Sequence, residues 1–318
     1  GLVRRVGLDY AGKIKVTDIG FPPAAVEPAE SGLELVTAAD LSDLIPPRRP
    51  LAHKGNFGHV FLLAGSPGMT GAAHLAAAAA LRAGAGLVTL GVPESLNPIL
   101  EIKCTEAMTL GLPETPRKTL APAGREKIDE FLEKATVVAV GPGLSRDEET
   151  GKLIRDLIKT CPLPLVIDAD GLNLLSGDIE VLSGAVAPRI LTPHPGEMSR
   201  LTGLSSKEIL ENRDEVARRF ARKYRCILVL KGAGTLIAGP SGPPGVNITG
   251  NPGMASGGTG DVLTGLIAGF LGQGLEAEAA ARLGVYVHGA AGDRAAETLG
   301  QISLIASDLL KAVPAVCK

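Results

Sequence analysis

Residues 135–143 of the chain, Ala-Thr-Val-Val-Ala-Val-Gly-Pro-Gly, decide the fold class. The run from Val137 to Val140 (VVAV) is apolar at every position and is followed by glycine, and the run from Ile227 to Leu230 (ILVL) is also apolar throughout. Side chains of a strand point alternately to the two faces of a sheet, so an unbroken apolar run indicates burial on both faces. The sequence therefore predicts one α/β domain with three α/β/α layers and a mostly parallel central sheet.

Outward from that run, from about residue 53, short β-branched stretches alternate with longer stretches rich in Ala, Leu, Glu, Lys and Arg. The short stretches predict strands and the longer ones predict helices. Strands are expected at His59–Ala64, Leu87–Val92, Thr136–Val140, Leu165–Asp168, Ile190–Thr192, Cys226–Leu230 and Thr235–Ala238. Helices are expected at Gly71–Ala83, Gly124–Lys134, Glu148–Thr160, Ser206–Tyr224, Thr259–Leu271 and Ala277–Leu299. Ligands of such sheets bind beyond the carboxyl ends of the strands, so the residues after each run are the candidate site.

Composition and charge exclude several classes of protein. The 318 residues include 41 Gly and 23 Pro, but 45 % hydrophobic residues without a Gly-X-Y period exclude disorder and collagen. A formal net charge of -2, with no Trp and three Tyr, argues against nucleic acid and anionic membranes as partners. The four cysteines form no CxxC pair, and no signal peptide or membrane-spanning stretch is visible. We therefore expect a soluble, cytoplasmic protein.

The first fifty residues differ from the rest of the chain. Six prolines between residues 22 and 50 indicate a connector, because each proline fixes φ and removes a hydrogen-bond donor. Ile14 to Ile19 (IKVTDI) alternates like a strand, yet the twenty residues there are too few to form a domain. We expect this segment to be the last strand of a truncated structural unit.

The strongest motif is Asn251–Asp261 (NPGMASGGTGD), which is followed by the apolar stretch VLTGLIAGFLG. Its glycines let successive N–H groups point at one place, and the helix that begins there adds the positive end of its dipole. The motif therefore predicts an anion-binding loop for phosphate, and a tight turn capped by Thr259 or Asp261 is the alternative. A P-loop is excluded because the segment contains no Lys.

Asp261 is the candidate catalytic residue of this motif. Its chemical interpretation is a base that takes a hydroxyl proton while a phosphoryl group is transferred. Its structural interpretation is capping of the helix N-terminus alone.

Two further motifs follow strands. In Lys231–Thr235 (KGAGT) the glycines permit close approach of a ligand, and a hairpin turn explains them equally well. In Thr192–Glu197 (TPHPGE) two prolines stiffen a loop that presents His194 and Glu197. A Glu there could hold a metal ion or its water shell near phosphates, whereas a lone His is more often structural.

The remaining glycine-rich loops lie at 65–72, 141–143 and 168–173. Each alone is consistent with an ordinary strand-to-helix turn. Together with the loops at 231–235 and 251–261 they place five glycine-rich segments on one edge of one sheet, which predicts a large ligand that carries phosphate. We interpret the alanine-rich helix over residues 72–83 as close packing of a helix on the sheet.

At this point the motifs resemble a known family, the ribokinase-like fold and within it the ADP/ATP-dependent NAD(P)H-hydrate dehydratases. The matching stretches are KGNFGHVFLLAGSPGMTGAAHLAA, VGPGL, VIDADGLN, LTPHPGE, LKGAGT and NPGMASGGTGD, which cover about 54–261, and VHGAAGD and SLIASDLL continue the likeness to 308. Sugar kinases of this fold usually have Asn-x-x-Glu at the place of His194 to Glu197. Here His194 replaces the Asn and Glu197 keeps the spacing, so the pattern that would support a metal role of Glu197 is met only in part.

The resemblance implies repair of NADH or NADPH whose nicotinamide ring has added water. Phosphoryl transfer from ADP or ATP to the ring hydroxyl of the S-epimer would make a leaving group. Elimination of phosphate would then restore the cofactor and leave AMP or ADP. Asp261 would take the hydroxyl proton, and the amides of residues 257–261 would stabilise the transferring phosphoryl group.

Carried over residue by residue, the resemblance implies a site for each ligand. The residues implied to bind the hydrate are Ala72, Gly143, His194, Pro195, Gly196, Glu197 and Asp261. Those implied to bind the nucleotide are Lys231, Gly232, Ala233, Gly234, Thr235, Asn251, Pro252, Gly253, Met254, Ala255, Ser256, Gly257, Gly258, Thr259 and Gly260. Mg2+ is the implied metal, with Glu197 as its residue, and ADP is the expected donor.

The resemblance extends to the first residues. GKIKVTDIGFPP resembles the closing strand and linker of a hydrate epimerase domain. We expect residues 1–30 to be a remnant of that domain and its linker, residues 31–318 to be the dehydratase domain, and the parent protein to be bifunctional. A homo-oligomer, a tetramer or larger, is also expected, partly from apolar residues on alanine-rich helices. The competing hypotheses are a vitamin or sugar-alcohol kinase of the same fold and a nucleotide-binding regulator without catalysis.

Overall fold

The computed structural model describes residues 32–45 and 48–317, together with residues 2, 7, 10–12, 14, 17, 19, 20 and 22. The strand expected over 14–19 includes residues outside this set, so it stays a prediction. Among the described residues, no helix is both long enough and apolar enough to cross a bilayer.

Ten strands of the described chain form one sheet, in the order β1-β10-β9-β8-β7-β6-β5-β2-β3-β4. Within it β9 runs antiparallel to β8 and β10, and the other neighbouring pairs are parallel. The mostly parallel sheet is therefore confirmed. The strands are β1 (Glu34–Leu35), β2 (His59–Leu63), β3 (Leu87–Pro93), β4 (Met108–Leu112), β5 (Val137–Val140), β6 (Leu165–Ile167), β7 (Arg189–Leu191), β8 (Ile227–Leu230), β9 (Thr235–Ala238) and β10 (Gly245–Asn247).

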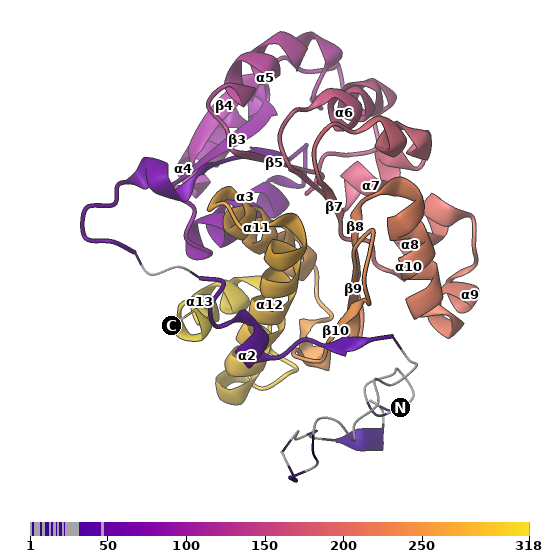
Figure 1. Cartoon of the computed structure of the whole chain (residues 1–318). Coiled ribbons are helices and arrows are strands. Elements are labelled where there is room, and N and C mark those ends of the chain that lie inside the picture. The colour runs from indigo at the N-terminus through magenta and orange to yellow at the C-terminus, as the bar shows by residue number, and fades with distance from the viewer. Residues whose placement is uncertain are drawn as a thin grey trace.

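Helices cover both faces of the sheet, as Figure 1 shows. In β2, Val60 and Leu62 belong to the core under α3, α11, α12 and α13, whereas Phe61 and Leu63 belong to the core under α5, α6 and α10. This alternation confirms the three layers. The helices are α2 (Ala38–Leu41), α3 (Thr70–Arg82), α4 (Asn97–Lys103), α5 (Arg125–Leu132), α6 (Glu148–Thr160), α7 (Asp170–Leu175), α8 (Pro195–Thr202), α9 (Ser206–Glu211), α10 (Arg213–Tyr224), α11 (Thr259–Gly272), α12 (Ala277–Leu299) and α13 (Ala306–Val316).

All seven expected strands are confirmed to within one residue at each end. One expected helix, 206–224, is wrong as a single element, because Asn212 leaves helical geometry (φ -126, ψ 38) and separates α9 from α10. Part of the expected connector, residues 34–41, forms β1 and α2 instead. Strand β1 pairs with β10, 211 positions further along the sequence, and a two-residue strand carries no periodic signal of its own.

The alanine-rich helix α3 packs through its small side chains, but its partner is a helix as well as the sheet. Ala76, Ala79 and Ala80 are fully buried in α3. A Cβ on Gly265 of α11 would lie 2.1 Å from the Ala76 carbonyl oxygen, and one on Gly269 would lie 2.6 Å from that of Ala80. Two helix backbones therefore touch, which fixes where α11 begins at the edge of the sheet.

Replacing Gly265 by Ala is expected to destabilise the protein by about 1–3 kcal/mol, although Ala favours helices, because the added methyl group has no room. The free energy of unfolding from denaturant titration measures this. Gly184→Ala is the control, since its Cβ would meet its nearest neighbour, Lys159, at 3.7 Å. Equal stability of the two variants would contradict the close contact between α3 and α11.

Candidate active site

The glycine-rich loops meet at the carboxyl edge of the sheet, as predicted. Gly65, after β2, donates its N–H to Pro142 O after β5 (2.9 Å). Lys231, after β8, donates its N–H to Pro193 O after β7 (2.9 Å). A Cβ on Gly141 would collide with the Asp168 carbonyl oxygen at 1.8 Å, so the loops after β5 and β6 also touch. Residues far apart in the sequence thus form one continuous surface.

A buried ion pair lies at the centre of this surface. The Lys231 Nζ is 2.8 Å from Asp168 Oδ1 and 3.7 Å from Glu197 Oε2. Asp168, 1 % exposed, also accepts hydrogen bonds from the hydroxyls of Thr192 and Thr264, both at 2.7 Å. Asp168 follows β6, and one side chain each from the segments after β7 and β8 and from helix α11 therefore contacts its carboxylate.

The electrostatics of the centre favour charged Lys231 and Asp168. Burial alone would raise the pKa of Asp168, but the Lys231 ammonium and the hydroxyl donors hold that pKa below its ordinary value. Burial would lower the pKa of Lys231, and Asp168 and Glu197 raise it instead. Burial raises the pKa of Glu197, because Lys231 compensates it only in part. The centre therefore holds one ammonium among carboxylates.

The loop before α11 borders this centre. Gly258, with φ 93, directly precedes the helix. Of the amides that follow it, Val262 is the first to donate to a backbone carbonyl, that of Gly258 (3.2 Å). Among the residues that the structure describes, none accepts a hydrogen bond from the amides of residues 257–261. A Cβ on Gly260 would lie 3.5 Å from Lys231 Nζ, so the ammonium lies beside the first turn of α11. The arrangement fits an anion.

Asp261 occupies the first turn of α11 and makes no capping hydrogen bond there. Burial raises its pKa to about 7, and the carboxylates of Asp168, Asp170 and Glu197 add to the rise while Lys231 opposes it. A carboxylate that titrates near neutrality is suited to accept a proton. The geometry thus favours the chemical interpretation of Asp261 over capping.

His194 and Glu197 have a structural role, which is independent of the ligand binding predicted for them. The Nδ1 of His194 accepts the N–H groups of Gly196 (2.9 Å) and Glu197 (3.3 Å), and Glu197 Oε2 accepts the His194 N–H (2.8 Å). Together with Pro195 as first helical residue, these bonds cap α8. The ligand roles expected of residues 194–197 stay predictions.

The other predicted binding residues lie in the same region. A Cβ on Gly143 would lie 3.3 Å from that of Ala72, so these two predicted hydrate-binding residues are neighbours. The segment 231–235 forms the hairpin turn between β8 and β9, which confirms the turn and leaves ligand binding open. Arg213 holds that turn by donating to Leu230 O (3.0 Å) and Ala233 O (2.7 Å).

Sequence reasoning missed several residues of the site. Asp168 begins the loop 168–173 and lies within the stretch VIDADGLN, where a carboxylate directly after an apolar strand was the available signal. Thr192 and Thr264 carry no signal of their own, because their partner is distant in sequence. His288 and Asp293 lie in VHGAAGD on α12, and both contact the loop before α11.

The side chains of the site bear on the predicted Mg2+. Among the described residues, no group of three or more His, Cys, Asp or Glu is arranged to hold a metal ion. Mg2+ usually binds one or two carboxylates together with waters and substrate phosphates. The buried carboxylate of Glu197, beside the anion loop, fits such an open site and not a closed cage.

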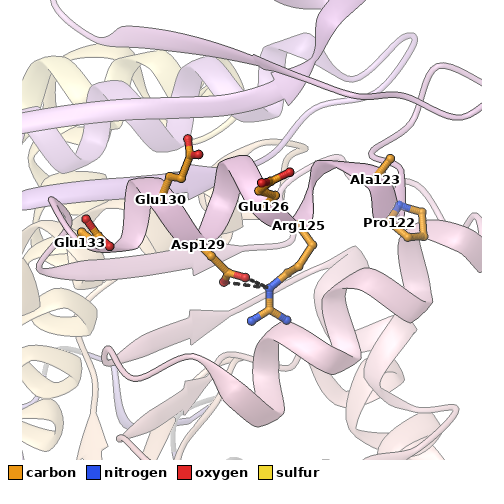
Figure 2. A pocket seen from close by; sticks show the side chains of 7 residues that line it. All are labelled: Pro122, Ala123, Arg125, Glu126, Asp129, Glu130 and Glu133. Atoms are coloured by element: carbon orange, nitrogen blue, oxygen red, sulfur yellow. Dashed lines mark hydrogen bonds and ion pairs between the residues drawn. The ribbon is translucent and has the colours of Figure 1, made fainter.

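A surface concavity of ≈ 650 Å³ lies elsewhere, on α5 (Figure 2). Acidic side chains of successive helical turns line it, and Arg125 pairs with Asp129 at 2.8 Å. The lining residues are Pro122, Ala123, Arg125, Glu126, Asp129, Glu130 and Glu133. None of them belongs to the five loops, so this concavity is separate from the candidate site.

Comparison with known proteins supports the motifs. A family profile described as NAD(P)H-hydrate dehydratase matches residues 60–315. The bifunctional NAD(P)H-hydrate repair enzyme Nnr of Moorella thermoacetica is 49 % identical over 318 residues, which are 100 % of this chain and 60 % of that protein. The chain thus spans less than two thirds of that relative's length.

Solved structures agree. The ADP/ATP-dependent NAD(P)H-hydrate dehydratase of Bacillus subtilis, co-crystallised with ATP/Mg2+, superimposes with a TM-score of 0.77 at 33 % identity, covering 89 % of this chain and 97 % of that one. A ribokinase-like superfamily protein of Enterococcus faecalis gives a TM-score of 0.78 at 29 % identity, covering 92 % and 98 %. The fold is therefore ribokinase-like.

Proposed function

The chain belongs to the NAD(P)H-hydrate dehydratase family of hydro-lyases, and from this premise we propose that it restores NADH or NADPH from the S-epimer of the hydrate with ADP or ATP. The products would be NAD(P)H, phosphate, and AMP or ADP. The observation that carries the proposal is Asp261, whose pKa is raised to about 7 by burial, in a helix turn that lies beside Lys231 and whose first amides have no protein acceptor. A base and an anion-binding loop are what phosphoryl transfer to a hydroxyl needs.

The chemistry follows from these positions. Asp261 takes the proton of the ring hydroxyl while the hydroxyl oxygen bonds to the terminal phosphorus of the nucleotide. The bond from that phosphorus to the bridging oxygen of the nucleotide breaks, and the bridging oxygen leaves with AMP or ADP. The amides of residues 257–261 and the Lys231 ammonium stabilise the negative charge on the transferring group. The phosphorylated ring then loses phosphate, which takes the C–O electron pair, and a neighbouring ring carbon loses a proton. The nicotinamide double bond is restored.

The binding residues are assigned in the same proposal. The hydrate would lie against Ala72, Gly143 and the segment 194–197, and the nucleotide against 231–235 and 251–260. Their position at one edge of the sheet supports this. Mg2+ would enter with the nucleotide phosphates and be held by Glu197, where it would neutralise phosphate charge.

The test is an assay with hydrated NADH or NADPH and each nucleotide in turn. Recovery of NAD(P)H absorbance together with released phosphate supports the dehydratase. Phosphorylation of a hydroxymethyl pyrimidine or a thiazole alcohol, without recovery of NAD(P)H, would instead establish the kinase that is the runner-up. Nucleotide binding without either reaction would establish the regulator.

The organisation of the whole protein is part of the proposal. The Moorella relative is bifunctional, which supports an epimerase domain in the parent chain, with 1–30 as its remnant and linker and 31–318 as the dehydratase domain. A homo-oligomer, a tetramer or larger, is still proposed, but most of the alanines of α3 are buried within the chain and do not support it. That proposal rests on the family resemblance alone.

The pH dependence of kcat/KM follows from Asp261. Only the ionised carboxylate accepts a proton, so kcat/KM is expected to rise with pH through a midpoint near the pKa of about 7. Asp170→Asn removes one of the negative charges that raise this pKa and should move the midpoint to lower pH. Steady-state kinetics across neutrality measure both.

Glu130→Gln, on α5, is the control and should leave the midpoint where it is. A midpoint that Asp170→Asn does not move would show that another group than Asp261 titrates in the assay.

A further inference from the structure

Helix α12 packs beside α11 (Figure 1) and holds both ends of the segment from Gly250 to Thr259, which leads into α11. At one end the Asp293 carboxylate accepts the Gly250 N–H (2.8 Å) and the Asn251 side-chain amide (2.9 Å). At the other end the Nε2 of His288 is 2.8 Å from Thr259 O. One helix thus holds the beginning and the end of the glycine-rich loop.

The contact is tight as well as polar. A Cβ on Gly289 would lie 2.2 Å from the Thr249 hydroxyl oxygen, and one on Gly292 would lie 2.2 Å from the Met254 sulfur. Thr249 also donates its hydroxyl to Tyr286 O (3.1 Å). The loop therefore lies directly on α12, and a small displacement of either would produce a clash.

The direction of the His288 hydrogen bond is fixed by its partner. A carbonyl oxygen only accepts, so Nε2 carries the proton and donates it to Thr259 O. Burial lowers the pKa of His288 to about 4, Lys231 lowers it further, and Asp168 and the Thr259 carbonyl oppose the change. The imidazole is therefore neutral at pH 7 and stays a donor through Nε2.

This bond acts on the next amide. In a trans peptide the C=O of Thr259 and the N–H of Gly260 point in opposite directions, so a donor on the carbonyl fixes where the amide points. A hydrogen bond at the carbonyl also polarises the peptide and strengthens its N–H as a donor. The Gly260 N–H then points away from His288 and is one of the amides without a protein acceptor.

We propose that His288 is a positioning residue for phosphoryl transfer, which aims and strengthens the Gly260 amide toward the terminal phosphate of the nucleotide. The inference rests on the proposed function for the identity of that phosphate. His288 itself touches neither reactant. Its effect passes through the peptide between Thr259 and Gly260.

His288→Ala is expected to lower kcat about tenfold to a hundredfold, less than the loss of a whole oxyanion donor, because the amide remains but is misaimed. The KM for the hydrate should stay near that of the wild type. By calorimetry ADP should bind about tenfold more weakly, and AMP, which lacks the terminal phosphate, should bind as before. His288→Gln, whose amide also donates, should restore most of kcat.

His59→Ala is the matched control. The Nε2 of His59 makes a 2.8 Å contact with the Thr89 hydroxyl at the amino end of β2, the edge opposite the site. It should lower thermal stability without changing kcat or the ratio of ADP to AMP affinity. A purely structural role of His288 would give the same pattern as His59.

The outcomes separate the two proposals. The positioning role would be overturned if His288→Ala left kcat and ADP affinity unchanged. It would also be overturned if the Ala and Gln variants lost as much affinity for AMP as for ADP. A wild-type protein that does not act on the hydrate would overturn the proposed function, and the ratio of ADP to AMP affinity would still decide the role of His288. If the Ala variant does not fold, the Gln variant and His288→Asn, whose shorter side chain does not reach as far, give the same comparison.

Discussion

Asp261→Asn is expected to abolish turnover while ADP still binds. The amide has the shape of the carboxylate but cannot accept the hydroxyl proton, and a general base typically contributes about 10²–10⁴-fold in rate. The amides of residues 257–261 and Lys231 remain in place, so the phosphate contacts are kept. Single-turnover recovery of NAD(P)H measures the rate and calorimetry with ADP measures binding. Turnover within tenfold of the wild type would remove Asp261 from its assigned role.

Stability separates this loss from unfolding. The pKa of Asp261 in the folded protein, about 7, lies above its ordinary value of 3.8, so the folded state holds the proton more tightly. The resulting contribution to stability is fully present below the ordinary pKa and is lost as pH rises to about 7. Asp261→Asn has no such loss and should equal or exceed the wild type in stability above pH 7. An inactive variant that is also less stable there would point to misfolding.

The sequence predicted the sheet well because the strands are buried on both faces. Val137 to Val140 alternate between the two cores, so every position is apolar and the run stands out. Arg189 in β7 shows the limit of the rule. It is charged yet 2 % exposed, because its guanidinium donates to carbonyl oxygens that include Ile158 O (2.9 Å) and Cys161 O (2.8 Å). A pattern of apolar residues cannot anticipate a cation satisfied in this way.

The site was predicted in part, for a related reason. Asp261 and the anion loop are contiguous in sequence, so glycine spacing and a following helix reveal them. The partners of Asp168 come from three other elements, with Lys231 63 positions away and Thr264 96 positions away, and only the fold brings them together. The role of His288 depends on a single carbonyl oxygen in another segment. Local patterns find loops, and they do not find the side chains that hold loops in place.

Lys231→Met should destabilise the protein by about 3–5 kcal/mol at neutral pH, the usual cost of leaving one partner of a buried ion pair without its counter-charge. Asp168 would keep only hydroxyl donors, and Glu197 would lose the ammonium at 3.7 Å. Lys223→Met is the matched control, because Lys223 pairs with Glu180 at 3.1 Å on the surface, where water screens the pair and its loss changes stability little. Denaturant unfolding of both variants measures the difference.

The pH dependence and the double variant identify the cause of that loss. The pKa of Asp168 is held below its ordinary value, so its contribution is present above that value and disappears as pH falls. The deficit of Lys231→Met should therefore shrink in acid, where Asp168 is protonated. Lys231→Met combined with Asp168→Asn leaves no buried charge at these two positions and should recover much of the stability. A double variant as unstable as the sum of the single ones would mean that packing of the lysine stem, rather than its charge, holds the carboxyl edges of β6 and β8 together.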